Sequence, residues 1–456
     1  MKSLRIALFT YSTKPRGGVV HTLNLAEELA RLKHRVHIYA LGSKEVSAVM
    51  SKPAPSLVEG TSDLPNIRVN RTKKRGSPPD PALSKVEGLL VDESLEFFRP
   101  VHVPYTIIPC STLPEENIDE KVKRYISMYT DYLSSVREHY DIYHAEDCIS
   151  ANMLCELRNR GLIKFFVRTV HHMDDFTSKS LIDCQLKSIL EPDYLIVVSR
   201  FWEKELRSRY SLNPTVINNG VDIEKFKNQG DEGIKERAKN SFSVSGSSTR
   251  LTTGCKVMLS IGGIEPRKNT LTALRAFNIV SNYFKSKGER LVWLIGGGET
   301  LFDYRAYREE FFSEVKRLGL KLGVREPQSN DEDIIVLGTV PEDSISKLYQ
   351  AGDVFVFPSV KEGWGLVVLE AMASGLPIIA SGIEPMTDYL KDEENALLVS
   401  PMDYEALAQQ IIRVLEKTEL RDKLARNGIK TAQAYSWRNT ALRHEEFYSG
   451  ILESVR

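Results

Sequence analysis

The sequence predicts an α/β protein with two doubly wound domains. The chain has 456 residues, too many for one compact core, which suggests two domains of roughly 200 residues. In each half, a segment typical of a buried strand leads through glycines into an amphipathic helix. This succession opens a doubly wound domain, in which ligands bind beyond the carboxyl ends of the strands.

The first of these openings is at the N-terminus. Residues 4–12 are apolar enough for a central parallel strand, and Val20 and Leu23 fall on one face of a helix expected over residues 19–33. Gly17 and Gly18, between the two, would let backbone approach a ligand closely. The loop is neither a Walker A loop nor a G-x-G-x-x-G fingerprint, so it does not identify the ligand.

The rest of the first half contains an irregular segment. Half of the chain's 20 prolines fall between Pro53 and Pro114, and we expect residues 42–92 to be an insertion that is at least partly loop-like. Its basic run, residues 71–75, could contact an acidic acceptor or lipid head groups, or be a solvated loop. Around this segment we expect strands at residues 35–40, 141–144, 164–170 and 193–198 and a helix near residues 115–139.

Polar residues gather at two of these strand ends. One strand is followed by HAED at residues 144–147 and the next by HHMDD at residues 171–175. Adjacent histidines point to opposite sides of an extended chain, so His171 and His172 could not easily chelate one metal ion. We expect no metal site.

The second opening carries a basic pair. A strand at residues 257–261 leads through Gly262 and Gly263 to Arg267 and Lys268, and a helix begins at Thr270. Guanidinium and ammonium groups at the end of a strand can neutralise a diphosphate without a metal ion. A surface-exposed basic loop is the alternative.

A third glycine run argues against a dinucleotide cofactor. Residues 296–298 are three glycines after a strand at residues 291–295, but a dinucleotide fingerprint would also need glycine where Leu301 stands. An NAD-dependent α/β enzyme therefore loses its best sequence support.

The most specific stretch is VKEGWGLVVLEAMASGLP at residues 360–377. A strand at residues 354–357 precedes it, Glu362 lies in a glycine-flanked loop, and Gly365 opens a helix that carries Glu370 and ends before Gly375. The N–H groups at the start of this helix could hold a diphosphate, and the two carboxylates could accept hydrogen bonds from sugar hydroxyls. The alternative is that Glu362 caps the helix and Glu370 is a solvated charge.

Composition excludes several classes of function. The formal net charge is zero, so nothing argues for nucleic-acid binding, and no apolar run reaches the roughly 20 residues of a membrane span. The N-terminus lacks the small-residue cleavage site of a signal peptide. The five cysteines include no Cys-x-x-Cys pair, which fits a reducing cytoplasm.

The stretch at residues 360–377 resembles the E-x7-E donor motif of retaining glycosyltransferases of family 4. Residues 215–222 (TVINNGVD) are similar to the interdomain signature of that family. The resemblance implies the GT-B fold, in which two Rossmann-like doubly wound domains face a cleft. We expect an N-terminal acceptor-side domain at residues 1–217, a nucleotide-sugar-binding domain at 218–436 and a helix at 437–456 that crosses back to the first domain.

The resemblance also implies roles for individual residues. Glu370 would hold the ribose hydroxyls, and Glu362 with His171 the donor sugar, with His172 as the rival of His171. Lys268, Arg267 and the backbone at Gly17 and Gly18 would stabilise the departing diphosphate. The remaining expected donor-binding residues are Gly363, Gly365, Leu366 and Val367 at the helix start, Gly297 in the glycine run, and Val340 near the base. Many family members carry arginine where this chain has Gly263, and here Arg267 lies beside Lys268 instead.

The expected function is metal-independent transfer of a sugar, with retention, from a nucleotide-diphosphate sugar to a hydroxyl acceptor. No cofactor is expected. The acceptor could be a glycan, a lipid or a small molecule, and the enzyme is expected in the cytoplasm, with contact at a membrane surface left open. The alternatives are a non-catalytic nucleotide-sugar-binding protein on the same fold and an NAD-dependent α/β enzyme.

Overall fold

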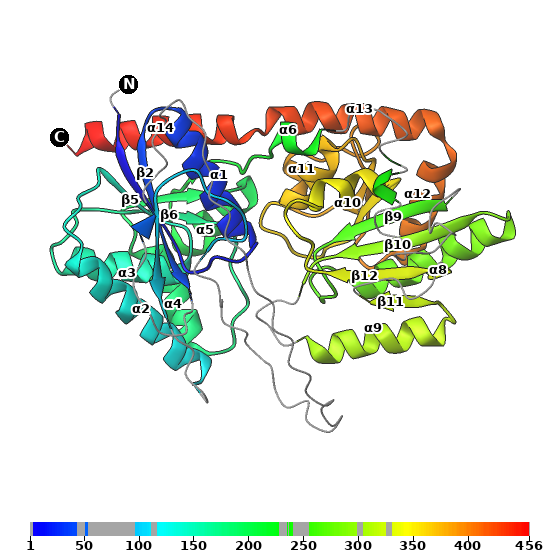
Figure 1. The fold of residues 1–456 in the computed structure, drawn as a ribbon, viewed down its shortest axis with the longest axis horizontal. Coiled ribbons are helices and arrows are strands. Elements are labelled where there is room, and N and C mark those ends of the chain that lie inside the picture. The colour runs from blue at the N-terminus through cyan, green and yellow to red at the C-terminus, as the bar shows by residue number, and fades with distance from the viewer. Residues whose placement is uncertain are drawn as a thin grey trace, which may run out of the picture.

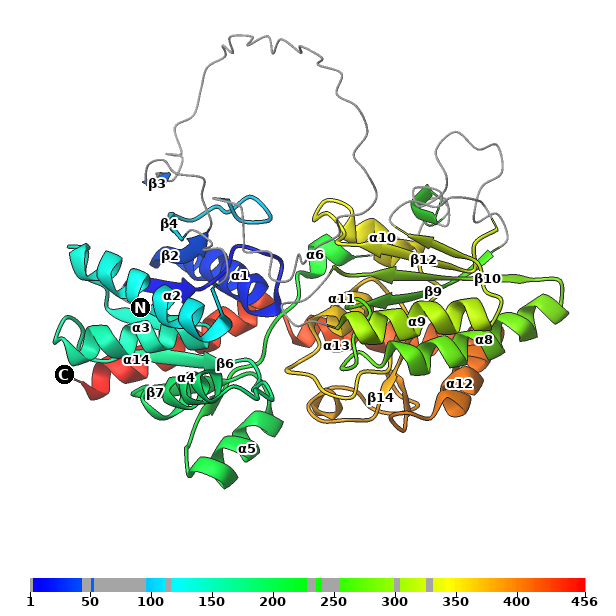
Figure 2. The same cartoon turned by 90° about the horizontal axis from the view of Figure 1, so that it is seen from below.

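The computed structural model describes residues 3–42, 51–52, 96–110, 116–227, 235, 237–239, 255–298, 304–324 and 331–455. These residues form two lobes, each built around one sheet with helices packed on it (Figures 1 and 2). The doubly wound α/β architecture expected from the sequence is confirmed.

The first lobe contains a sheet in the order β3-β4-β2-β1-β5-β6-β7-β8, parallel except for β3, which pairs antiparallel with β4. Its strands are β1 Arg5–Thr10, β2 Arg35–Gly42, β3 Ser51–Lys52, β4 Tyr105–Pro109, β5 Ile142–Ala145, β6 Val167–Val170, β7 Tyr194–Val197 and β8 Thr215–Val216. Its helices are α1 Gly17–Arg31, α2 Ile118–Ser135, α3 Cys148–Asn159, α4 Lys179–Leu190 and α5 Arg200–Tyr210.

The second lobe contains a parallel sheet in the order β11-β12-β10-β9-β13-β14-β15. Its strands are β9 Cys255–Ile261, β10 Arg290–Gly296, β11 Leu322–Val324, β12 Ile334–Gly338, β13 Val354–Phe357, β14 Ile378–Ser381 and β15 Leu397–Val399. The helices that follow the first lobe are α6 Ile223–Phe226, α8 Thr270–Ser286, α9 Arg305–Arg317, α10 Ile345–Ala351, α11 Leu366–Ala373, the 3₁₀ helix η1 Met386–Asp388, α12 Tyr404–Glu416, α13 Thr418–Ala434 and α14 Trp437–Ser454.

Helices cover both faces of each sheet, because the central strands are apolar on both sides. In the first lobe, α1 and α14 pack on one face, and α2 and α3 on the other. In the second lobe, α8, α9 and α12 share one buried cluster with the sheet, and α10, α11 and α13 share another. The chain order reverses between β1 and β5 and between β9 and β13, and ligands of such sheets bind at these two switch points.

The structure differs from the sequence predictions at three places, one in a loop and two at strands that were not predicted. Gly17 and Gly18 belong to the first turn of α1, which begins directly after Arg16, and not to a turn that precedes the helix. Strand β4 was missed, because it lies among the prolines of the irregular segment and is recognisable only by its pairing with β2. The two-residue strand β8 was also missed. Most of the insertion expected at residues 42–92 lies outside the described residues, including the basic run at residues 71–75.

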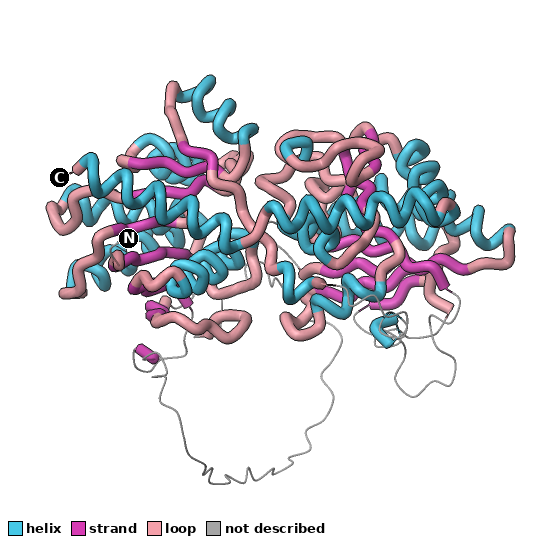
Figure 3. The backbone as a smooth tube through the Cα atoms, turned by 90° about the horizontal axis from the view of Figure 1, so that it is seen from above, coloured by secondary structure: helices cyan, strands magenta, loops and turns pink. Residues whose placement is uncertain are grey.

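The C-terminal helix crosses back to the first lobe, as the sequence resemblance implied. Tyr448 and Ile451 of α14 are buried in the same cluster as residues of α1 and β1. Helices α13 and α14 run almost in line across the two lobes (Figure 3). At the crossing point, the Val221 N–H donates to the Tyr435 carbonyl at 2.8 Å, and a Cβ on Gly220 would lie 2.3 Å from the backbone nitrogen of Trp437. The two connections between the lobes therefore pack directly against each other.

Candidate active site

Lys268 and Glu362 meet at the switch point of the second lobe. Lys268 follows β9 and Glu362 follows the neighbouring strand β13, and the Lys268 Nζ lies 2.6 Å from the Glu362 Oε1. Arg267 joins them, with its Nη1 3.1 Å from the same carboxylate oxygen. The structure therefore brings together three residues that the sequence singled out in two separate loops.

Glycines make room for this cluster. Gly262 has a φ of 138°, and a Cβ there would lie 2.6 Å from the Lys268 Cε, so the lysine side chain passes directly over it. Gly263 has a φ of 76°, and a Cβ there would lie 2.9 Å from the Gly298 carbonyl oxygen. A side chain at position 263 would therefore be strained and crowded.

The Glu362 carboxylate is held ionised. Burial opposes its charge, but Lys268 and Arg267 outweigh burial and lower the pKa of Glu362. The side chains of Lys268 and Glu362 are only 13% and 7% exposed. The carboxylate thus neutralises the two cations that the sequence assigns to a diphosphate.

Helix α11 begins beside this cluster. Gly365 precedes it with a φ of 84°, and a Cβ there would lie 2.9 Å from the Tyr389 hydroxyl. That hydroxyl donates to the Trp364 carbonyl at 3.0 Å and fixes the turn. No side chain caps the helix start, where Leu366 and Val367 are half-buried, so the first N–H groups of α11 remain for an anion.

Glu370, one helical turn further on, lies in a buried setting. Its Oε2 accepts a hydrogen bond of 2.6 Å from the Tyr349 hydroxyl on α10. Burial raises the pKa of Glu370, and the bond from Tyr349 opposes that change. Sequence reasoning missed Tyr349, for which the only signal was a tyrosine on the apolar face of a short helix.

The remaining predicted donor-binding positions line neighbouring loops. Gly297 follows β10 with a φ of 127°, and its N–H donates to the Gly338 carbonyl at 2.8 Å. The Val340 Cγ2 lies 3.4 Å from where a Cβ on Gly296 would be. The loops after β9, β10 and β12 therefore pack together beside the Lys268 cluster.

His171 lies directly after β6 in the first lobe. Its Nε2 lies 3.1 Å from the Glu146 Oε2, and its Cδ2 lies 3.5 Å from where a Cβ on Gly18 would be. His172 is half-exposed and lies 3.4 Å from an Asp174 carboxylate oxygen. Of the two histidines, His171 is the one that turns into the lobe.

The two lobes touch at this point. A Cβ on Gly363 would lie 2.4 Å from the His171 carbonyl oxygen, so the loop of Glu362 meets the end of β6. Lys361 and Asp175 form an ion pair of 2.5 Å across the same boundary. A cavity of about 420 Å³ lies beside them, lined by Lys361, by residues 173–176 and by residues of α4 and α5.

One group of described residues could offer ligands to a metal ion. Its potential ligand atoms, from His21, Glu146 and His171, lie within 4.8 Å of one another. Sequence reasoning did not single out His21, which occupies a buried position on α1. The side chains of His21 and Glu146 have no solvent exposure, whereas that of His171 is 12% exposed. The expectation of no metal site stays a prediction.

Comparisons with known proteins match both halves of the chain. Residues 101–225 match the model of Glycosyltransferase Family 4, and residues 247–431 match that of Glycosyl transferases group 1. An uncharacterized glycosyltransferase of Methanocaldococcus jannaschii is 25% identical over 99% of this chain and 100% of its own length. A D-inositol 3-phosphate glycosyltransferase of Corynebacterium urealyticum is 25% identical over 76% of this chain and 81% of its own.

Solved structures with the same architecture cover almost the whole chain. The sucrose-phosphate synthase of Thermosynechococcus elongatus has a TM-score of 0.70 at 19% identity, over 98% of this chain and 99% of its own. Anabaena HepE, solved with UDP and glucose, has a TM-score of 0.68 at 16% identity over the same shares. The two-lobed fold is therefore that of the GT-B enzymes.

Proposed function

Because the chain is a glycosyltransferase, with a first half of the Family 4 type and a second half of the group 1 type, we propose that it transfers a sugar from a nucleotide-diphosphate sugar to a hydroxyl acceptor with retention. One observation carries this proposal. Glu362 pairs with Lys268 and Arg267 beside the start of α11, and the loop of Glu362 contacts the backbone of His171.

Sugar transfer requires positive charge around the departing diphosphate. As the bond between the sugar C1 and the diphosphate breaks, negative charge develops on the leaving group. Lys268, Arg267 and the first N–H groups of α11 stabilise that charge, and preorganised donors of this kind are each worth about 3 kcal/mol of barrier. Because these groups supply the charge, the reaction needs no metal ion.

The carboxylates and the histidine orient the donor. Glu370, buried and held by Tyr349, accepts hydrogen bonds from the ribose hydroxyls. Glu362 and His171, on opposite sides of the boundary between the lobes, contact the donor sugar. Retention follows if the acceptor attacks from the face that the diphosphate leaves, with a diphosphate oxygen taking the acceptor's proton.

The acceptor hydroxyl enters from the first lobe. The cavity of about 420 Å³ beside Lys361 and Asp175 lies next to the loop of Glu362 and would give the acceptor a route to the donor sugar. The acceptor is a glycan, a lipid or a small molecule.

A cytoplasmic location is part of the proposal and is supported by the five cysteines, all within the described residues, none of which forms a disulfide. In the described part of the chain, no helix is both long and apolar enough to cross a bilayer.

A panel of donors tests the proposal. UDP-, GDP- and ADP-sugars are screened by thermal shift, starting with UDP-glucose because the HepE neighbour was solved with it, and hydrolysis of each is then measured without acceptor. We expect one nucleotide class to raise the melting temperature and its sugar to be hydrolysed slowly. The Lys268→Ala variant is the control and should lose hydrolysis. Binding without any hydrolysis would instead indicate a non-catalytic nucleotide-sugar-binding protein.

A further inference from the structure

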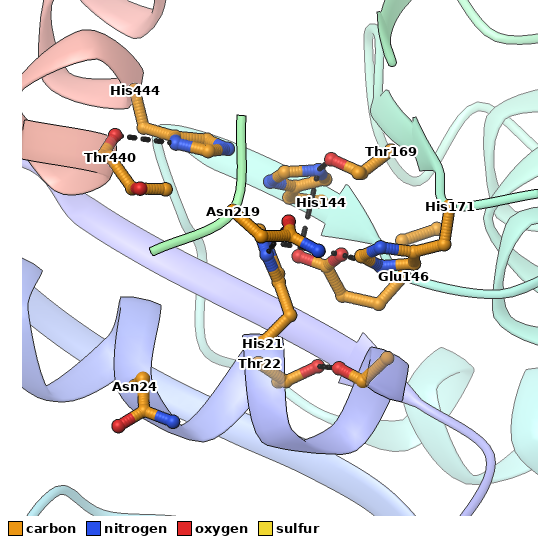
Figure 4. A network of polar contacts seen from close by, with 12 residues as sticks. His21, Thr22, Asn24, His144, Glu146, Thr169, His171, Asn219, Thr440 and His444 are labelled. Atoms are coloured by element: carbon orange, nitrogen blue, oxygen red, sulfur yellow. Dashed lines mark hydrogen bonds and ion pairs between the residues drawn. The ribbon is translucent and has the colours of Figure 1, made fainter. Parts of the chain in front are cut away.

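A buried carboxylate lies behind His171. Glu146 follows β5, its side chain has no solvent exposure, and the imidazoles of three histidines surround it (Figure 4). The Nε2 atoms of His171, His21 and His144 lie 3.1, 3.6 and 3.7 Å from its oxygens. Only His171 is within hydrogen-bond distance.

The other two histidines are held by different partners. His144 bonds the Tyr448 hydroxyl through Nδ1 at 2.6 Å and the Thr169 hydroxyl through Nε2 at 2.7 Å. His21 bonds the Asn219 Oδ1 through Nδ1 at 2.8 Å. Their ring orientations therefore do not depend on Glu146.

His171 is different, because Glu146 is the one hydrogen-bond partner of its ring among the described residues. Its Nδ1 is buried and has no partner there. Burial, helped by the nearby Arg168, lowers the pKa of His171, so the ring is neutral and carries one proton. Burial raises the pKa of Glu146, and the charge of the nearby Arg168 opposes that change. In its ionised form Glu146 can only accept, which puts the proton of His171 on Nε2 and the lone pair on Nδ1.

Both the ring and the backbone of His171 are packed against neighbouring segments. Its ring packs against Gly18 of α1, and its carbonyl touches Gly363 beside Glu362. The ring also packs edge-on against that of His21, with centroids 4.8 Å apart. What remains to be set is the tautomer of the ring, and the bond to Glu146 sets it.

We propose that Glu146 is a positioning residue for sugar transfer: it fixes His171 as the Nε2–H tautomer, with the lone pair on Nδ1. This inference rests on the proposed function, because it assumes that His171 contacts the donor sugar. Glu146 itself acts only through His171.

The first test needs no substrate. Long-range ¹H–¹⁵N spectra of the histidine rings, assigned with His171→Ala, should show His171 as the Nε2–H tautomer at pH 7.5. Glu146→Leu should convert it to a mixture or to the Nδ1–H form. Glu146→Gln, whose amide oxygen can still accept from Nε2–H, should keep the wild-type signature. An Nδ1–H tautomer in the wild-type protein, or an unchanged tautomer in Glu146→Leu, would overturn the proposal.

The second test is a double-mutant cycle on donor hydrolysis, using whichever of UDP-, GDP- and ADP-glucose stabilises the protein most. Glu146→Leu should lower kcat about 10- to 100-fold, leave the Kd of the nucleoside diphosphate within twofold of wild type, and add nothing in the His171→Ala background. Glu146→Gln should stay within about threefold of wild type. Additive losses in the double variant would show that Glu146 does not act through His171.

A matched control separates positioning from general stability. Tyr448→Phe removes a buried hydroxyl from the same network, at His144, without touching Glu146 or His171. It should lower the melting temperature and leave kcat unchanged, and an equal loss of kcat would overturn the proposal. If none of the three donors is hydrolysed, the proposed function fails, while the tautomer spectra still decide the role of Glu146.

Discussion

Replacing Glu362 with glutamine should tighten the binding of the diphosphate while slowing sugar transfer. The Glu362 carboxylate lies 2.6 Å from the Lys268 Nζ and 3.1 Å from the Arg267 Nη1. A bound diphosphate has to share these cations with the carboxylate. Without that negative charge, the buried Lys268 has no counter-charge at this contact until an anion binds.

The size of the change in affinity follows from the contact between Glu362 and Lys268. A hydrogen bond between charged groups contributes about 1.5–3 kcal/mol. We count only the bond to Lys268, whose side chain is 13% exposed, because Arg267 is 40% exposed and solvent screens it. Since 1.4 kcal/mol is tenfold, the Kd of the nucleoside diphosphate should fall about 10- to 100-fold.

Calorimetry measures this directly, with the nucleoside diphosphate selected by the donor panel and with inorganic pyrophosphate as a probe that has no base. Glu265→Gln is the matched control, because this buried carboxylate lies 3.8 Å from Arg267 and does not pair with Lys268. It should change either Kd less than threefold. An unchanged or weaker affinity in Glu362→Gln would show that the diphosphate does not bind at these cations.

Three further predictions concern the same fold. Glu370→Ala should weaken nucleoside diphosphate binding at least about tenfold, whereas Lys268→Ala should mainly lower kcat for donor hydrolysis; calorimetry and initial rates separate the two, and unchanged binding in Glu370→Ala would contradict the assignment. Tyr349→Phe leaves the buried Glu370 without its donor and should lower the free energy of unfolding in urea by about 1–3 kcal/mol, and no loss would refute that contact. Burial lowers the pKa of His21 to about 3 from 6.5, so below pH 6.5 the unfolded chain binds a proton there that the folded chain does not. The wild type should therefore lose about 1.4 kcal/mol more stability than His21→Gln between pH 7.5 and 5.5 in urea unfolding, and equal losses would contradict a neutral buried His21.

The fold was predictable where its signals are local. Strand β13 and the start of α8 lie where the apolar run and the periodic pattern predict them. Strand β4 was not predictable, because it is five residues long, ends at Pro109 and is defined by its pairing with β2 more than 60 residues earlier in the chain. This strand is recognised by a contact between distant parts of the chain, which local sequence patterns do not reveal.

The site shows the same division. The spacing of Glu362 and Glu370 and the basic pair at Arg267 and Lys268 were visible in the sequence, and the structure brings Glu362 to both cations. The partners that set the chemistry were not visible. Glu146 reaches His171 from the neighbouring strand β5, across 25 residues of sequence. Tyr349 reaches Glu370 from another helix. Such contacts depend on tertiary packing, for which the sequence carries no periodic signal.

The most direct test of the account is a crystal structure with the nucleoside diphosphate bound. We predict diphosphate oxygens within hydrogen-bond distance of the Lys268 Nζ and of the first N–H groups of α11, with the ribose hydroxyls on Glu370. A nucleotide bound elsewhere, with Lys268 still paired only to Glu362, would contradict it.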